Sequence, residues 1–239
     1  DSTATGFEQL IDETRAFLSG SVSLALEGIN RVGDELQFDV RLSNQSGHKF
    51  PTSYPSRRAW LHVTLTDGQG IVVFESGAVD ALGRVAGLAS DADLASYEPH
   101  YRTIDSGDQV QSYETIMEDI NGNLTYTLLE ASAFRKDNRL LPSGMVKTNV
   151  PSSIQPQGNA LVDPDFVGGS DLVSYRIRGL AGGTYRIDVR LNFQSVGYNF
   201  IQDLITDDDE PRVALFRDLN DKAGTRFETI QTVTENVNF

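Results

Sequence analysis

The sequence of 239 residues has no cysteine, one tryptophan and three histidines. Without cysteine, the chain cannot form a disulfide, a thiolate metal site, a thiol nucleophile or a covalent c-type haem attachment. Because His48, His62 and His100 are its only histidines, we do not expect a multi-histidine metal centre. The lack of cysteine leaves the cellular compartment open.

A long apolar run and an excess of positive charge are also missing. No stretch of about 18 apolar residues occurs, so the sequence predicts no membrane span. The 34 acidic and 20 basic residues give a formal net charge of −14. Nucleic-acid phosphates would be repelled by such a chain, which excludes nucleic acid as an expected partner. The charge instead suits a soluble protein in a salty or calcium-containing medium.

The periodicity of the apolar residues changes after residue 20. Between residues 5 and 19 they recur at helical spacing, and Gly20 is a natural helix end. Further along, alternating runs separated by turn residues predict strands and hairpins. We expect three hairpins, built from residues 22–27 with 35–42, 59–66 with 71–76, and 172–179 with 183–196. We expect further strands at 109–117 and 227–237, a strand or short helix at 124–134, and short helices at 198–205 and 211–221.

These elements predict a mainly β protein. The expected fold is an antiparallel β-sandwich of Ig-like or jelly-roll type, with an N-terminal helix and short C-terminal helices. Residues 1–20 would be a docking segment and 21–239 a single domain. Two long stretches without periodicity, 77–107 and 135–171, are either functional or held in place by other contacts.

Three loops concentrate carboxylates beside turn residues, and calcium binds such oxygens. The alternative is that these aspartates serve turns and face solvent. The loop of Asp163, Asp165 and Asp171 and that of Asp207 and Asp209 are the leading calcium candidates. The remaining carboxylates of these three loops are Asp91, Asp93, Asp208 and Glu210.

Catalysis is not expected. The sequence has no G-x-S-x-G nucleophile elbow, and nothing in it pairs Glu75, Glu98, Glu114 or Glu118 as the two carboxylates of a glycosidase.

The three histidines and two of the arginines have different expected roles. His62 lies within an expected strand and is read as structural. His100 is either a cofactor ligand or a hydrogen-bonded loop residue, whereas His48, exposed by a Gly–Pro loop, could reach a metal or a haem iron. Arg57 and Arg58 would point to opposite faces of a strand, so that one reaches a carboxylate and the other faces solvent or an anionic group such as a haem propionate. The alternative is two ordinary salt bridges.

Six ordered stretches resemble a known domain. They are "GHKFPTSYPSRRAWLHVTLTDGQGIVVFESG" (47–77), "YEPHY" (97–101), "QVQSYETIMEDINGNLTYTLLEA" (109–131), "KDNRLLPSG" (136–144), "DPDFVGGSDLVSYRI" (163–177) and "VRLNFQSVGYNFIQDL" (189–204). Together they resemble the C-terminal, haem-free β domain of multihaem c-type cytochromes, over roughly residues 20–217. Ser53 stands where that domain usually has glycine.

The resemblance implies a non-catalytic accessory or scaffold role in extracytoplasmic electron transfer, at the periplasm or cell surface. The domain would pack on haems or dock a multihaem cytochrome domain or another redox protein. His48 would be a distal ligand to a partner's haem c, with Arg57, Arg58 and His100 as further cofactor contacts. No covalent cofactor is expected in this chain. The competing hypothesis is a secreted carbohydrate- or protein-binding β-sandwich stabilised by calcium.

Overall fold

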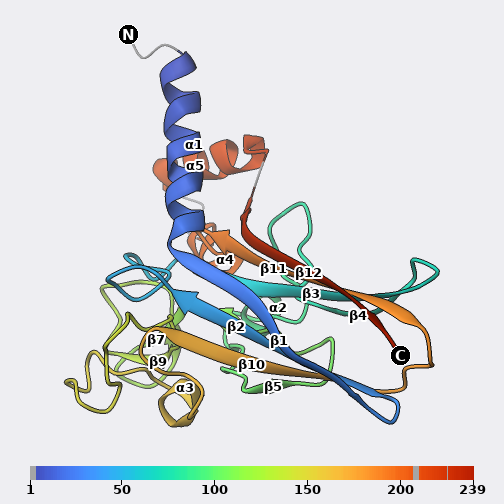
Figure 1. The fold of residues 1–239 in the computed structure, drawn as a ribbon. Helices are drawn as coiled ribbons and strands as arrows, with labels where there is room; N and C mark the ends of the chain where they lie inside the picture. Colours follow the sequence, from blue (N-terminus) through green and yellow to red (C-terminus); the bar gives the residue numbers. More distant parts are fainter. Residues whose placement is uncertain (1–3, 207–209, 225) are drawn as a thin grey trace.

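Two β-sheets lie face to face, and one helix projects from their end (Figure 1). The computed structural model describes residues 4–206, 210–224 and 226–239. The first sheet has the order β1 (Val22–Val32), β2 (Glu35–Asn44), β10 (Ser170–Ile177), β5 (Thr103–Ile104). The second has the order β12 (Glu228–Asn238), β11 (Thr184–Gln194), β3 (Arg58–Asp67), β4 (Val72–Ser76), and β6 (Ser112–Tyr113) pairs with one end of β3. Strands make up 38% of the chain, so the prediction of a mainly β, antiparallel sandwich is confirmed.

Two of the three predicted hairpins form. β1 pairs with β2 and β3 pairs with β4, both antiparallel. The prediction of the third hairpin is wrong, because β10 pairs with β2 and β5 whereas β11 pairs with β3 and β12. The short link between them therefore crosses from one sheet to the other. A glycine-containing link fits both geometries, so the local sequence could not separate them.

A smaller sheet lies beside the sandwich, and it contains part of the strand predicted at 109–117. It has the order β8 (Leu124–Thr125), β7 (Thr115–Glu118), β9 (Ala133–Asp137). The strand predicted at 109–117 is split at Glu114, since β6 joins the second sheet and β7 joins the small one. Residues 124–134 form two short strand segments with a turn between them.

The core lies between the two sheets. Alternate residues of β2, from Leu36 to Leu42, are fully buried, and so are the apolar residues of β11 from Ile187 to Leu191. Phe38 stacks on Tyr175 with ring centres 5.1 Å apart. This alternation is what the sequence predicted, because successive side chains of a strand point to opposite faces.

One strand, β3, is buried on both faces along its first half. Leu61 joins the main core, whereas Trp60 packs into a second cluster with Val85, Leu88 and Val110. Val85 and Leu88 come from the long loop between β4 and β5, and Val110 comes from the segment between β5 and β6. Both segments are therefore held in place by an apolar contact, and they cover a sheet face that would otherwise meet water.

A buried ion pair fixes the same loop to the sheet. Arg58, 1% exposed, donates from both terminal nitrogens to Asp91 at 2.6 and 2.8 Å, and from Nε to Gln194 at 2.7 Å. Asp91 also accepts the backbone N–H of Val85 at 2.8 Å. Arg58 is the inward-facing arginine that the strand geometry predicted.

Five helices complete the described part of the chain. They are α1 (Ala4–Gly20), α2 (Ala89–Ala92), α3 (Asn159–Val162), α4 (Tyr198–Leu204) and α5 (Pro211–Lys222). The first and the last two were predicted; α2 and α3 are single turns within the long loops. Within the described part of the chain, no helix combines the length and apolar character that crossing a bilayer requires.

Breaking the Arg58–Asp91 pair should be costly. We expect Arg58→Met to lower the free energy of unfolding by about 3–5 kcal/mol, because Asp91 would be left as an uncompensated buried charge. The double variant Arg58→Met/Asp91→Leu should recover part of that loss. Urea denaturation measures both, with Arg41→Met, which breaks a half-exposed pair with Glu27, as the control. Equal losses for Arg58→Met and the control would contradict this prediction.

Candidate functional site around His100

A buried cluster of polar side chains lies at one end of the first sheet. His100, Asp163 and Asp171 each offer one potential ligand atom, and these atoms lie within 4.8 Å of one another. All three residues are buried, and His100 is only 3% exposed. All three were predicted from the sequence as site residues, but in two separate roles: His100 as a cofactor contact and the two aspartates as a calcium site.

Three segments bring the cluster together. His100 belongs to the loop between α2 and β5, Asp163 follows α3, and Asp171 lies on β10. Asp171 has the same strand parity as Val173 and Tyr175, so it points into the core. Asn159, at the start of α3, donates to the His100 carbonyl at 3.3 Å. The ring of Phe166 meets the imidazole edge-on at 5.1 Å.

Two amide groups face one nitrogen of His100. Gln111 Nε2 lies 2.8 Å and Asn138 Nδ2 lies 3.1 Å from His100 Nδ1. The Gln111 oxygen accepts the backbone N–H of Tyr101, which fixes that amide. The Asn138 oxygen accepts the N–H of Glu114, and its nitrogen donates to the Ser112 carbonyl. If either side-chain amide were rotated by 180°, its NH2 group would face the backbone N–H that its oxygen now accepts. Both amides therefore present N–H groups to the imidazole ring.

The tautomer of His100 follows from these contacts. Nδ1 must accept, so the proton of the neutral ring lies on Nε2. Nε2 is 3.3 Å from Asp163 Oδ2 and 3.9 Å from Asp171 Oδ1. With its proton directed at the carboxylates, Nε2 has no lone pair for a metal or an iron. As placed, His100 is a hydrogen-bonded loop residue, and its role as a cofactor contact stays a prediction that would need rearrangement of the two amides.

The two carboxylates differ in their electrostatics. Burial raises the pKa of Asp171, although His100 and the Tyr113 hydroxyl, 2.7 Å from Oδ2, act in the opposite direction. Burial also acts to raise the pKa of Asp163, but the hydrogen bonds from His100 and from the Asp165 N–H outweigh it and lower that pKa. Asp163 thus favours the ionised form, whereas ionised Asp171 is the less favourable of the two.

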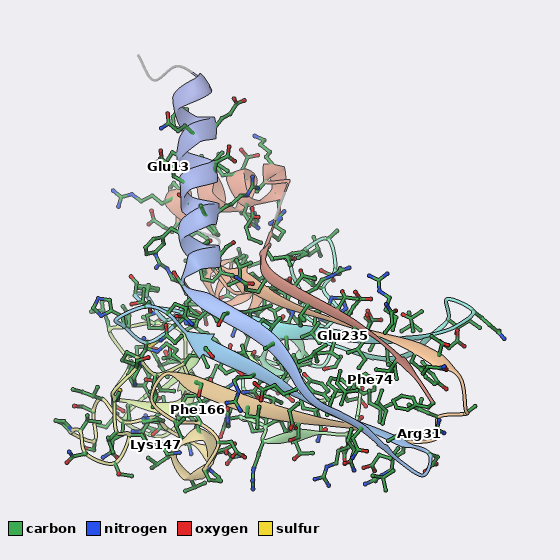
Figure 2. The ribbon with its side chains drawn as sticks, viewed as in Figure 1. Glu13, Arg31, Phe74, Lys147, Phe166 and Glu235 are labelled. Carbon is green, nitrogen blue, oxygen red and sulfur yellow. The ribbon has the colours of Figure 1, made fainter. Side chains whose placement is uncertain are left out.

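A lysine lies beside this cluster. Lys147 donates from Nζ to the carbonyl oxygens of Ala160 and Asp163, and Nζ lies 5.9 Å from the centre of the Phe166 ring (Figure 2). Burial lowers the Lys147 pKa, and the nearby aspartates partly offset this. The lysine supplies positive charge near the carboxylates without forming a direct ion pair with them.

The remaining calcium candidates do not converge on one site. Asp165 pairs with Arg102, Nε to Oδ2 at 2.6 Å, and Asp91 pairs with Arg58. Asp93 accepts from Ala95 N–H and Ser96 Oγ, and Glu210 accepts from Arg212 N–H at the start of α5. Asp207, Asp208 and Asp209 lie outside the described residues.

His48 lies in an exposed loop between β2 and β3. Its carbonyl accepts from Asn44 Nδ2 at 2.7 Å and from Ser46 Oγ at 2.9 Å, whereas its imidazole forms no hydrogen bond with any described residue. Ser53 has a φ of 76°, in the left-handed region that favours glycine, which is the residue the resembling domain usually has there. Arg57 Nη1 donates to the Thr52 carbonyl at 3.2 Å.

The third histidine lies on the second sheet. His62 Nε2 is 2.8 Å from Glu75 Oε1 on the neighbouring strand. Throughout the described residues, no serine or threonine hydroxyl is hydrogen-bonded to a histidine ring, so no Ser–His pair is formed there.

The site includes residues that the sequence did not nominate, namely Gln111, Tyr113 and Asn138. Asp171 could have been identified as buried, since it alternates in phase with the apolar residues of its strand. The amides of Gln111 and Asn138 carry no comparable local signal, because their partners lie on distant segments.

The fold and this cluster define an antiparallel β-sandwich with a buried histidine between carboxylates and amides. A comparison with protein-family models finds no match, and no curated protein matches the sequence. Among solved structures, the chain is similar to a penta-heme cytochrome c552 from Thermochromatium tepidum, with a TM-score of 0.49 and 14% sequence identity over 93% of this chain and 41% of that one. The chain thus spans less than half of that structure's length, and the domain resemblance stays a prediction.

The tautomer of His100 can be measured directly. We expect two-bond 1H–15N correlation spectra at neutral pH to show an unprotonated Nδ1 and a protonated Nε2, because both amides donate to Nδ1. His100→Leu should lower the free energy of unfolding by about 2 kcal/mol or more, since buried donors and an acceptor lose their partner.

His62→Leu is the matched control, because its ring faces Glu75 at the surface, and it should cost much less. A protonated Nδ1 in the native protein would contradict the assignment, and together with an unprotonated Nε2 it would restore Nε2 as a metal ligand.

Proposed function

We propose that this chain is a non-catalytic accessory domain that docks to a haem-carrying redox protein, a multihaem c-type cytochrome domain, in the periplasm or at the cell surface. The observation that carries the proposal is an uncovered apolar helix face. Phe7 and Leu10 are 58% exposed and Phe17 is 72% exposed, all on one side of α1. An amphipathic helix normally buries such a face against another surface.

The position of α1 supports a docking role. The helix projects away from the sandwich and is joined to it only near its C-terminal end in Figure 1. There Leu18 packs on the core, the Ser19 carbonyl accepts from Gln231, and Arg15 pairs with Glu228 at 2.8 Å. Phe7, Leu10 and Phe17 remain uncovered and are left for a partner.

A second feature lies at the same end of the molecule. The His48 loop begins where β2 ends, beside the base of α1: Asn44 is opposite Val22, and Gln45 N–H donates to the Ser21 carbonyl at 2.9 Å. A partner seated on α1 would therefore have the unpaired imidazole of His48 within its neighbourhood. This arrangement favours His48, rather than the enclosed His100 or Arg58, as the contact to a partner's haem.

Calcium at Asp163 and Asp171 is a second part of the proposal. Two oxygens each about 2.3–2.6 Å from one calcium ion lie up to about 5 Å apart, which matches the spacing of this cluster. A cation would also compensate Asp171, whose ionised form is disfavoured by burial. The ion would be held by carboxylates and loop oxygens, with His100 keeping its Nε2 proton.

Docking should depend on the α1 face. We expect the triple variant Phe7→Ser/Leu10→Ser/Phe17→Ser to bind a multihaem c-type cytochrome from the same organism at least about tenfold more weakly than the unaltered chain, since three anchoring side chains are lost. Sedimentation velocity followed at the haem absorbance measures the affinity. The melting temperature should not fall, because these side chains are exposed.

The matched control is Glu8→Ser/Asp12→Ser/Glu13→Ser, which alters the polar side of the same helix and should bind normally. His48→Ala should remove any change in the haem spectrum that accompanies docking. Failure of the unaltered chain to bind, or equal binding by both triple variants, would refute the docking role.

Calcium is tested by melting. If the ion is bound, removing it with a chelator should lower the melting temperature, and restoring calcium should reverse the change by mass action. The response should vanish in Asp163→Asn and persist in Asp93→Asn. A melting temperature unaffected by chelator would remove calcium from the proposal.

A further inference from the structure

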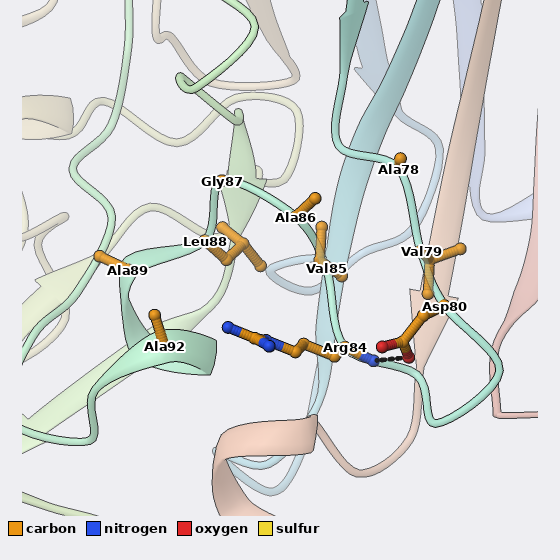
Figure 3. A pocket seen from close by; sticks show the side chains of 10 residues that line it. All are labelled: Ala78, Val79, Asp80, Arg84, Val85, Ala86, Gly87, Leu88, Ala89 and Ala92. Atoms are coloured by element: carbon orange, nitrogen blue, oxygen red, sulfur yellow. Dashed lines mark hydrogen bonds between the residues drawn. The ribbon is translucent and has the colours of Figure 1, made fainter.

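A hollow on the opposite side of β3 from the main core is formed by the loop after β4. Its volume is about 550 Å³, within the range of about 300–1,000 Å³ common for small-molecule sites. Apart from Asp80 and Arg84, the lining is glycine and apolar side chains (Figure 3). Val79, Arg84, Ala86, Ala89 and Ala92 are at least partly exposed there, whereas Val85 and Leu88 are only 1% and 2% exposed.

The walls of this hollow are fixed. A short hairpin forms one wall, with Val79 opposite Val85 and Ala86 N–H donating to the Ala78 carbonyl at 2.8 Å. Asp80 closes its turn by accepting the N–H groups of Leu82 and Arg84. The Gly83 carbonyl accepts from Gln194 at 2.7 Å, which ties the hairpin to the Arg58–Asp91 pair. A ligand would therefore find a preformed site and need not order it.

Arg84 is the one basic side chain in the lining. It extends from the hairpin across the hollow toward α2, where Ala92 lies (Figure 3). Its guanidinium is exposed and makes no hydrogen bond or ion pair with any described residue. Of the nearby aspartates, Asp80 accepts two backbone N–H groups through Oδ1, Asp91 is bound on both oxygens by Arg58, and Asp93 accepts from Ala95 N–H and Ser96 Oγ.

A second hollow of about 390 Å³ shares Arg84 and Ala92 with the first. Ser90 lines it, and the buried Ser90 hydroxyl has no hydrogen-bond partner among the described residues. Asp93 also lines it, and hydrogen bonds from Ala95 N–H and Ser96 lower the Asp93 pKa, which keeps that carboxylate ionised. Because Arg84 is the one cation in the lining of either hollow and Asp93 is an anion, a ligand head can carry no more than one negative charge.

We propose that this hollow binds a short aliphatic monocarboxylate, with its carboxylate paired to the Arg84 guanidinium and its hydrocarbon chain against Val79, Ala86 and Ala89. The planar guanidinium matches a carboxylate in a two-bond geometry. The apolar part of the lining accounts for the hydrocarbon chain. The net charge of −14 does not prevent this, because charges more than about 8–10 Å away are largely screened.

Isothermal titration calorimetry with sodium butanoate, hexanoate and octanoate tests the site on the full chain. Affinity should rise along the series by up to about fourfold per buried methylene. Arg84→Gln should weaken hexanoate binding by about tenfold or more, as expected for loss of a charged hydrogen-bond partner. Hexanol and hexylammonium should bind correspondingly more weakly than hexanoate.

Two further variants keep the test decisive. Ala92→Phe places a large ring over the hollow and should block binding while leaving Arg84 in place. Arg212→Gln removes an exposed arginine of α5 that lines neither hollow, and it should bind as the unaltered chain does. Undetectable hexanoate binding, or binding that is unchanged in Arg84→Gln or in Ala92→Phe, would overturn the proposal.

Discussion

The buried pair of Arg58 and Asp91 is the constraint on which much of the structure depends. It joins the first residue of β3 to α2, the single turn of helix in the long loop between β4 and β5, and Gln194 extends the link to β11. With the loop held there, Trp60 is covered and β3 is buried on both faces. Two charges in such a place are costly unless they satisfy one another, and here both Asp91 oxygens accept from the guanidinium.

Buried polar groups that satisfy one another also fix the structure around His100, where they take the place of apolar core residues. Asp171 enters the core in the row of Val173 and Tyr175, and Tyr113, Gln111 and His100 surround it with hydrogen-bond donors. The two long loops are therefore held by different means, one by an ion pair and a tryptophan, the other by a histidine and amides. In both cases a long irregular segment is fixed by a few satisfied buried polar groups.

The two proposed contacts use opposite kinds of surface. The α1 face is apolar, projects from the molecule and suits a large partner, whereas the Arg84 hollow is small, preformed and carries a single unpaired cation. The first would give the chain its place beside a redox protein, and the second would let it carry or sense a small acid. Since neither depends on the other, each proposal can fail alone.

Much of the fold could be predicted from the sequence, because alternation of apolar residues and turn chemistry are local signals. Those signals placed α1, β1 to β4, β11 and β12. They could not decide that β10 and β11 lie in different sheets, because a six-residue link serves either arrangement. The protonation of His100 and the unpaired state of Arg84 were decided only by the tertiary structure, since both follow from which distant groups do or do not reach a side chain.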